Sequence, residues 1–217
     1  MLSISNGLLL LSTLFSLGSM IFIVRGNWRN PTNLFFGIFL AFLALWSGVL
    51  IAFQTTIFSE FAIFYGKIAY VAALGIGVSL YLFSIVFPEG IRPKTSTIVN
   101  ACFVSFIFIF FLVSEPTFLI ENIKISSLGR DMQVANIGYF IFAALFCFFY
   151  LGGLIKLWGK YIKEKIGILK QQLLVIAISV TITGVGGMFY NLVLASPFFQ
   201  DFRYLWSGPI FATAVAV

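Results

Sequence analysis

Residues 32–53 of this chain read TNLFFGIFLAFLALWSGVLIAF, a run without a single charged side chain. As an α-helix this run would be about 33 Å long, at about 1.5 Å of rise per residue. The hydrocarbon core of a bilayer is about 30 Å thick, so one such segment is long enough to cross it. The run therefore predicts a membrane-spanning helix.

Similar runs fill the rest of the chain. Hydrophobic residues make up 61% of the 217 positions and charged residues 9%, whereas soluble domains have about 45–50% and about 25%. We predict an all-α protein with one domain over residues 1–217, an integral membrane bundle of seven transmembrane helices. The predicted spans are Gly7–Val24, Thr32–Phe53, Phe61–Phe87, Thr97–Val113, Ile137–Trp158, Leu173–Leu194 and Ser207–Val217.

Helix-ending and helix-starting residues separate these spans. Asn30-Pro31 supplies an N-cap and a first-turn proline for the second helix, and Phe87–Gly90 ends the third. Gly159 is predicted to end the fifth. The last run is only 11 residues long, about 16 Å as a helix. We expect the seventh helix to be truncated in this chain, and a short or re-entrant tail is the alternative.

The basic residues predict the orientation. Nine of the 13 Lys and Arg residues fall in the first, third and fifth loops, which makes these loops cytoplasmic by the positive-inside rule. The N-terminus is then outside and the C-terminus points toward the cytoplasm. The nine are Arg25, Arg29, Arg92, Lys94, Lys156, Lys160, Lys163, Lys165 and Lys170; the other four are Lys67, Lys124, Arg130 and Arg203.

The net charge of +6 comes mainly from these loops. It suits anionic lipid headgroups, so the predicted partner is the bilayer and not nucleic acid. Four lysines between Lys156 and Lys165 lie beside Trp158 and Tyr161. They read as a basic, aromatic anchor at the inner interface; a docking patch for a cytoplasmic partner is the alternative.

The side chains needed for catalysis are scarce. The chain has no histidine, and no Asp or Glu lies in the core of a predicted span. We therefore predict no enzyme activity for this chain, no cofactor and no metal site. The run Gly184-Val185-Gly186-Gly187 is expected to let helices approach closely, and a broken-helix transport site is the alternative.

A ligand pocket is expected in the outer half or the middle of the bundle. Lys67 either extends to the outer interface or faces the bundle interior and receives an anionic or lipid-like ligand. Trp46 lies mid-span, where its indole N–H needs a partner inside the bundle. The candidate ligand-binding residues are Trp46, Gln54, Lys67, Tyr70, Tyr190 and Asn191.

The one long loop, Ser114–Asn136, is predicted on the outer face. Leu119–Ser126 alternates apolar and polar residues, as a strand does. Gly129-Arg130-Asp131 is expected to turn the chain back into a second strand over Met132–Val134. The resulting hairpin is either a lid over the pocket or a passive connector.

Three stretches carry a family resemblance. They are Asn30-Pro31-Thr32-Asn33 leading to Leu43-Ala44-Leu45-Trp46; Phe64-Tyr65-Gly66-Lys67-Ile68-Ala69-Tyr70 running to Phe83-Ser84-Ile85-Val86-Phe87-Pro88; and Phe202-Arg203-Tyr204 followed by Gly208-Pro209-Ile210. With them the chain resembles the N-terminal seven-helix membrane region of bacterial and archaeal sensor histidine kinases and related signalling proteins.

The resemblance implies a sensory input domain in the cytoplasmic membrane of a prokaryotic cell. Such a domain would bind a small or lipid-like ligand, or sense the bilayer, and pass a conformational signal through the seventh helix. The receiver would be a cytoplasmic output module such as a histidine kinase or diguanylate cyclase, through which the protein would form a homodimer. A small transporter or permease-like bundle is the alternative function.

Overall fold

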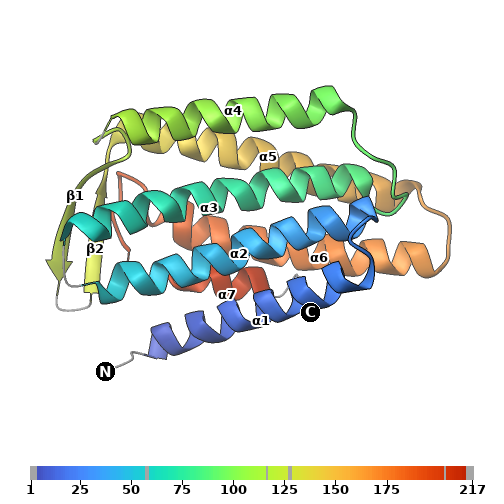
Figure 1. Ribbon diagram of the computed structural model, residues 1–217, viewed down its shortest axis with the longest axis horizontal. Helices are drawn as coiled ribbons and strands as arrows, with labels where there is room; N and C mark the ends of the chain where they lie inside the picture. The colour runs from blue at the N-terminus through green and yellow to red at the C-terminus, as the bar shows by residue number, and fades with distance from the viewer. Residues whose placement is uncertain (1–3, 57–58, 116, 127–128, 203, 214–217) are drawn as a thin grey trace.

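The computed structural model (Figure 1) describes residues 4–56, 59–115, 117–126, 129–202 and 204–213, with the side chains at 59–60, 124–126, 129–131 and 136 excepted. Its described part contains seven α-helices, one π-helical turn and one two-stranded sheet. The all-α prediction is confirmed. The elements are α1 (Ile4–Asn27), α2 (Pro31–Thr55), α3 (Ser59–Val86), α4 (Thr95–Ser114), β1 (Ile120–Ser126), β2 (Gly129–Val134), α5 (Asn136–Lys163), α6 (Ile168–Met188), η1 (Phe189–Val193) and α7 (Ser207–Thr213).

Consecutive long helices run antiparallel, side by side (Figure 1). The β1–β2 hairpin lies at one end of the bundle, which we name the hairpin end. The loops that join α1 to α2, α3 to α4 and α5 to α6 lie at the opposite end, which we name the basic end because the basic residues of those loops gather there.

Six helices, α1 to α5 and α6 continued by η1, are long and apolar enough to cross a membrane. They match the first six predicted spans, and the chain has the make-up of a multi-pass membrane protein. The seventh predicted span coincides with α7 as far as Thr213, and residues 214–217 lie outside the described residues.

The helix α3 forms the centre of the bundle. Within its most apolar stretch 67% of the residues are buried, against 17% in α1 and in α4. The outward face of α4 carries exposed phenylalanines such as Phe103, Phe106 and Phe110. A helix that is apolar all round and mostly uncovered by protein suits a lipid environment.

Two of the predicted helix boundaries are confirmed, and one is wrong. The Asn30 side chain accepts a hydrogen bond from the Thr32 N–H at 2.9 Å and caps α2, and α3 ends at Val86. Gly159, however, lies inside α5, which continues to Lys163. A mid-helix glycine costs about 1 kcal/mol relative to alanine. Its neighbours hold this turn: the Trp158 indole donates to Thr181 Oγ1 at 3.1 Å and Lys160 Nζ donates to Phe87 O at 2.6 Å.

The predicted hairpin is confirmed, but its turn is misplaced. Strands β1 and β2 pair antiparallel, with Ser126 opposite Gly129, so Gly129-Arg130-Asp131 belongs to the second strand. The cross-strand pairing extends further than the turn-forming residue types suggested.

The start of α5 packs against the segment that leads into the hairpin, and we expect a Gly138→Ala substitution to destabilise the protein. A Cβ at Gly138 would lie 1.8 Å from Phe118 O and 3.1 Å from Leu119 Cα, both backbone atoms. The backbone must shift to admit it, at a cost of about 1–3 kcal/mol. Thermal unfolding in detergent measures the loss.

Gly159→Ala is the matched control for this substitution, because a Cβ there meets nothing within 4 Å. Alanine is also the better helix former, so this variant should unfold at or above the wild-type temperature. Equal unfolding temperatures for the two variants would contradict the packing argument.

Candidate functional site

A cavity of about 60 Å³ lies inside the bundle, between α2, α3, α5, the α6–η1 helix and α7. Its walls are almost entirely apolar, and none of the described residues that line it is charged. The lining residues are Trp46, Leu50, Ala69, Tyr70, Ala73, Ile76, Met132, Phe142, Phe146, Tyr150, Thr183, Gly184, Gly187, Met188, Asn191, Leu192, Leu205, Gly208 and Ala212. An apolar pocket with a few converging polar groups is the usual form of a small-molecule site.

Two of the polar groups in the wall are engaged within the protein. The Tyr150 hydroxyl donates to Val180 O at 2.8 Å, and Thr183 Oγ1 donates to Phe211 O at 2.7 Å. Both bonds tie α6 to a neighbouring helix. These two side chains are therefore part of the scaffold that shapes the cavity.

Asn191 is in the opposite situation. Both polar atoms of its side-chain amide are buried, and neither has a hydrogen-bond partner. A buried amide without partners costs about 1–3 kcal/mol. Among the described residues, the Trp46 indole and the Tyr70 hydroxyl also lack a hydrogen-bond partner, although both line the same cavity. Three residues of the cavity wall thus have polar side-chain groups without hydrogen-bond partners.

A π-helical turn places Asn191 in the wall. In η1 the Leu194 N–H bonds to Phe189 O, five residues back, at 3.0 Å. Single π-helical turns within α-helices occur frequently at functional sites. The Tyr139 hydroxyl donates to Leu192 O and so satisfies a carbonyl near the end of this helix. Tyr139 thus holds this turn from α5, and Asn191 lies in the cavity wall.

The close approach of α7 completes the wall. A Cβ at Gly208 would lie 2.0 Å from Asn191 Nδ2 and 2.7 Å from Trp46 Cη2. Only glycine lets the α7 backbone approach both side chains so closely. Farther along α7, Ser12 Oγ on α1 lies 3.1 Å from Ser47 Oγ on α2 and donates to Pro209 O at 3.3 Å. Three helices are thereby joined beside the cavity.

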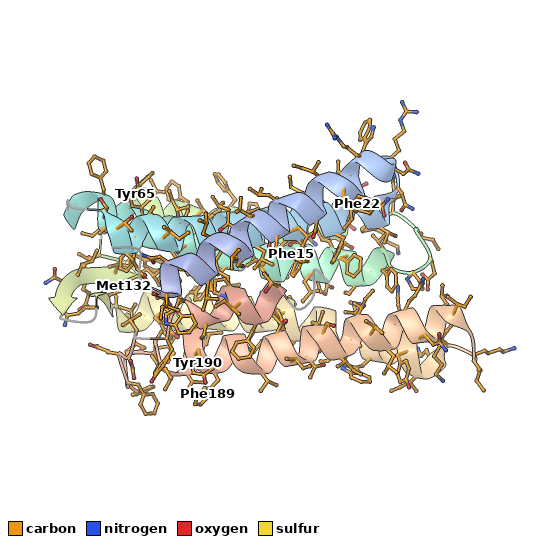
Figure 2. All side chains as sticks on the ribbon, turned by 90° about the horizontal axis from the view of Figure 1, so that it is seen from below. Phe15, Phe22, Tyr65, Met132, Phe189 and Tyr190 are labelled. Carbon is orange, nitrogen blue, oxygen red and sulfur yellow. The ribbon has the colours of Figure 1, made fainter. Side chains whose placement is uncertain are left out.

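The hairpin reaches the same cavity through Met132 of β2, which Figure 2 shows at the hairpin end of the molecule. A Cβ at Gly66 of α3 would lie 2.7 Å from Ile120 Cδ1 and 3.2 Å from Met132 Sδ. The hairpin therefore packs tightly on the first turns of α3.

The cavity brings together three of the six candidate ligand-binding residues: Trp46, Tyr70 and Asn191. Gln54, Lys67 and Tyr190 do not line it. Tyr190 instead stacks on Phe211, with ring centroids 5.9 Å apart, and contacts Tyr204 at 5.7 Å. Figure 2 shows it on η1 beside Phe189.

Lys67 makes a specific contact that the sequence did not predict. Its Nζ donates a hydrogen bond to Leu112 O, at 2.7 Å, in the last turn of α4. Cations near a helix C-terminus interact favourably with the unpaired carbonyls and the helix dipole. In this structure, Lys67 therefore caps a neighbouring helix.

Several wall residues were not among the sequence candidates, notably Tyr150, Thr183, Gly187 and Gly208. The glycine run of α6 gave the nearest signal. A Cβ at Gly184 would lie 2.7 Å from Tyr150 Cε1, and one at Gly186 would lie 2.7 Å from Phe211 Cγ, so the predicted packing role of the run is confirmed. Gly187 instead faces open space and the cavity.

No group of three or more His, Cys, Asp or Glu side chains in the described part of the chain could hold a metal ion. Cys102 and Cys147 are free thiols.

No protein-family model matches this chain, and no curated protein matches it.

We expect Asn191→Leu to stabilise the ligand-free protein by about 1 kcal/mol or more, because it removes a buried amide without partners and keeps a similar side-chain volume. Thermal unfolding in detergent measures the change. Asn191→Asp is the matched control, since an unpaired buried carboxylate should strongly lower the unfolding temperature. A lower unfolding temperature for Asn191→Leu would mean that the amide is satisfied in the folded protein.

We expect Lys67→Met to destabilise the protein by about 1–2 kcal/mol, because it removes the charge-assisted hydrogen bond to Leu112 O. Lys94→Met is the control, since Lys94 is exposed and its side chain makes no capping hydrogen bond to α4. The same loss of stability in both variants would argue against the cap.

Proposed function

We propose that this chain is a membrane-embedded sensory input domain, which binds a small or lipid-like ligand in the cavity and signals through the seventh helix. One observation carries the proposal: the wall that contains the unpartnered Asn191 amide is shared with α7, through Gly208 and Ala212, and with Leu205 just before it. A ligand in the cavity touches the helix that would lead to an output module.

The signal would arise from a hydrogen bond between the ligand and the Asn191 amide. A ligand that pairs with the amide changes the position of a group that lies against Gly208. Because α7 is bonded to α1 through Pro209 O and to α6 through Phe211 O, its displacement requires those contacts to rearrange. The ligand shifts this equilibrium only by its difference in affinity for the two arrangements.

The wall favours a neutral, mostly apolar ligand with one hydrogen-bonding group. Among the described residues, no charged side chain lines the cavity, and the groups without partners are an amide, an indole N–H and a hydroxyl. At 60 Å³ the cavity is far smaller than the roughly 300 Å³ of a drug-sized site. The occupant is thus a very small molecule or one end of a chain, in contact with Met132 of the hairpin.

A second, open groove could accommodate a continuation of the seventh helix toward the basic end. The groove has a volume of about 750 Å³ and lies between Leu14–Ile23 of α1, Phe36 of α2 and Val175–Ser179 of α6. It begins next to the last contacts of α7, at the level of Ser12 and Thr183. Figure 2 shows α7 between α1 and α6, with Phe15 and Phe22 along α1 beyond it.

The proposed orientation has the hairpin end outside the cell and the basic end in the cytoplasm, where the loops carry the excess of Lys and Arg. The membrane would be the cytoplasmic membrane of a prokaryote. The output module would be a histidine kinase or diguanylate cyclase that follows α7 and dimerises. The chain itself supplies binding and transmission, without catalysis.

One feature also suits the alternative, a small transporter. A helix interrupted at a binding site is typical of transporters, and η1 interrupts the sixth span. Transporters usually repeat the interruption in a second helix, and the described parts of α1 to α5 are continuous α-helices. The sensor is therefore the better-supported function.

The first test is to sequence the encoding gene beyond the codon for Val217. We expect about ten further apolar residues, a basic linker and a kinase or cyclase module. A stop codon at that point, or only more membrane helices, would overturn the sensor proposal and favour the transporter.

The second test measures the output activity of the full chain with Gly187→Leu. A side chain at Gly187 meets no atom within 4 Å and projects beside the cavity, so leucine should fill it and hold the output in one state. Val185→Leu is the matched control, because Val185 lies on the same helix and its side chain is 70% exposed on the surface of the bundle. An equal ligand response in both variants would rule out the cavity as the sensing site.

A further inference from the structure

A second hollow lies at the basic end, between the last turns of α3 and α5. This cleft has a volume of about 320 Å³ and is lined by Ser84, Ile85, Glu89, Lys156, Gly159, Lys160 and Lys163. It is separate from the central cavity and shares no residue with it.

The charges in the cleft do not cancel. Lys160 Nζ lies 3.6 Å from Glu89 Oε2 and donates to Ile85 O and Phe87 O, so it is held by α3 and the turn that follows. Lys156 lies over the Tyr81 ring at 5.6 Å, and neither it nor Lys163 forms an ion pair with a described residue. Three lysines against one glutamate leave two positive charges without a counter-ion.

The cleft exists because Gly159 has no side chain. A Cβ at this position would meet nothing within 4 Å. Lys156, Lys160 and Lys163 stand on the same face of α5 as Gly159, because residues three and four apart are neighbours on a helix. The glycine thus leaves room for a group of atoms between the lysine side chains.

An apolar surface adjoins the lysines on α5. Phe148, Ile155 and Ile162 follow one another at intervals of seven residues and are 67%, 69% and 73% exposed. Trp158 and Tyr161, with rings 5.5 Å apart, lie at the same level as the cleft. Paired aromatic residues at this depth are typical of a membrane–water interface.

We propose that this cleft binds the phosphate headgroup of an anionic phospholipid, with Lys156 and Lys163 as the ligating cations. The acyl chains lie along the Phe148–Ile155–Ile162 surface. The adjoining apolar surface favours a lipid over a free phosphate ion, which would gain nothing from it. Basic pockets between membrane helices bind such headgroups by charge. The proposal does not depend on the sensory function.

Native mass spectrometry of the delipidated chain tests the site. The probe is dioleoylphosphatidylglycerol, and dioleoylphosphatidylcholine and inorganic phosphate are the comparisons. We expect tight binding of the anionic lipid alone. Lys163→Gln should weaken it about fivefold, the loss expected for one lysine near the membrane surface.

Gly159→Leu and Lys165→Gln separate a built site from general attraction. Gly159→Leu fills the cleft without changing the charge and should remove the tight binding. Lys165→Gln removes one charge outside the cleft and should leave the binding unchanged. If Gly159→Leu fails to fold, the comparison of Lys163→Gln with Lys165→Gln decides alone.

Three results would overturn the proposal. Equal losses in Lys163→Gln and Lys165→Gln would indicate non-specific attraction to the lysines. Equal binding of the zwitterionic lipid would exclude recognition of charge. Full competition by inorganic phosphate would identify a site for a soluble anion.

Discussion

Backbone carbonyls at helix ends have no partner within their own helix, and within a bilayer no water can replace it. This bundle satisfies several of them with side chains from neighbouring helices. Lys67 of α3 donates to α4, Lys160 of α5 donates to the end of α3, and Tyr139 of α5 donates to the end of η1. Each of these bonds fixes where one helix ends relative to another. The requirement for backbone partners therefore helps to fix how the helices are offset from one another along their axes, as well as the secondary structure.

In the wall of the central cavity, by contrast, a buried polar side chain is left without hydrogen-bond partners. The hydroxyl groups of Thr183 and Tyr150 bond carbonyls of other segments, whereas the buried Asn191 amide has no hydrogen-bond partner among the described residues. A buried, unpaired amide lowers the stability of a folded protein, and leucine would fill a similar volume without this loss. Functional sites often retain such locally unfavourable residues. A π-helical turn, an unpaired amide and a glycine contact to α7 thus meet in one wall of the cavity.

Hydropathy alone predicted the spans, because lipid selects long apolar runs. Period-two alternation likewise predicted the hairpin. Helix ends were less certain: Gly159 reads as a stop in the sequence but is held within α5 by its neighbours. The site residues were predicted from their depth in the membrane. Trp46, Tyr70 and Asn191 line the cavity, whereas Gln54, Lys67 and Tyr190 do not. A helix that is apolar all round does not reveal its rotation. Tyr190 and Asn191 are adjacent, so they point in different directions. The π-helical turn that orients them is not marked by any residue pattern in the sequence.

The uneven burial of the helices has a consequence for how this protein can evolve. Only 17% of the apolar stretch of α1 and of α4 is covered by protein, so most positions there are selected for hydropathy and not for identity. Leucine, isoleucine and phenylalanine can replace one another along those faces with little effect. In α3, where 67% is buried, and at glycines that touch another helix, the permitted residues are few. Relatives of this protein should therefore share scattered small and buried residues within otherwise freely drifting sequences.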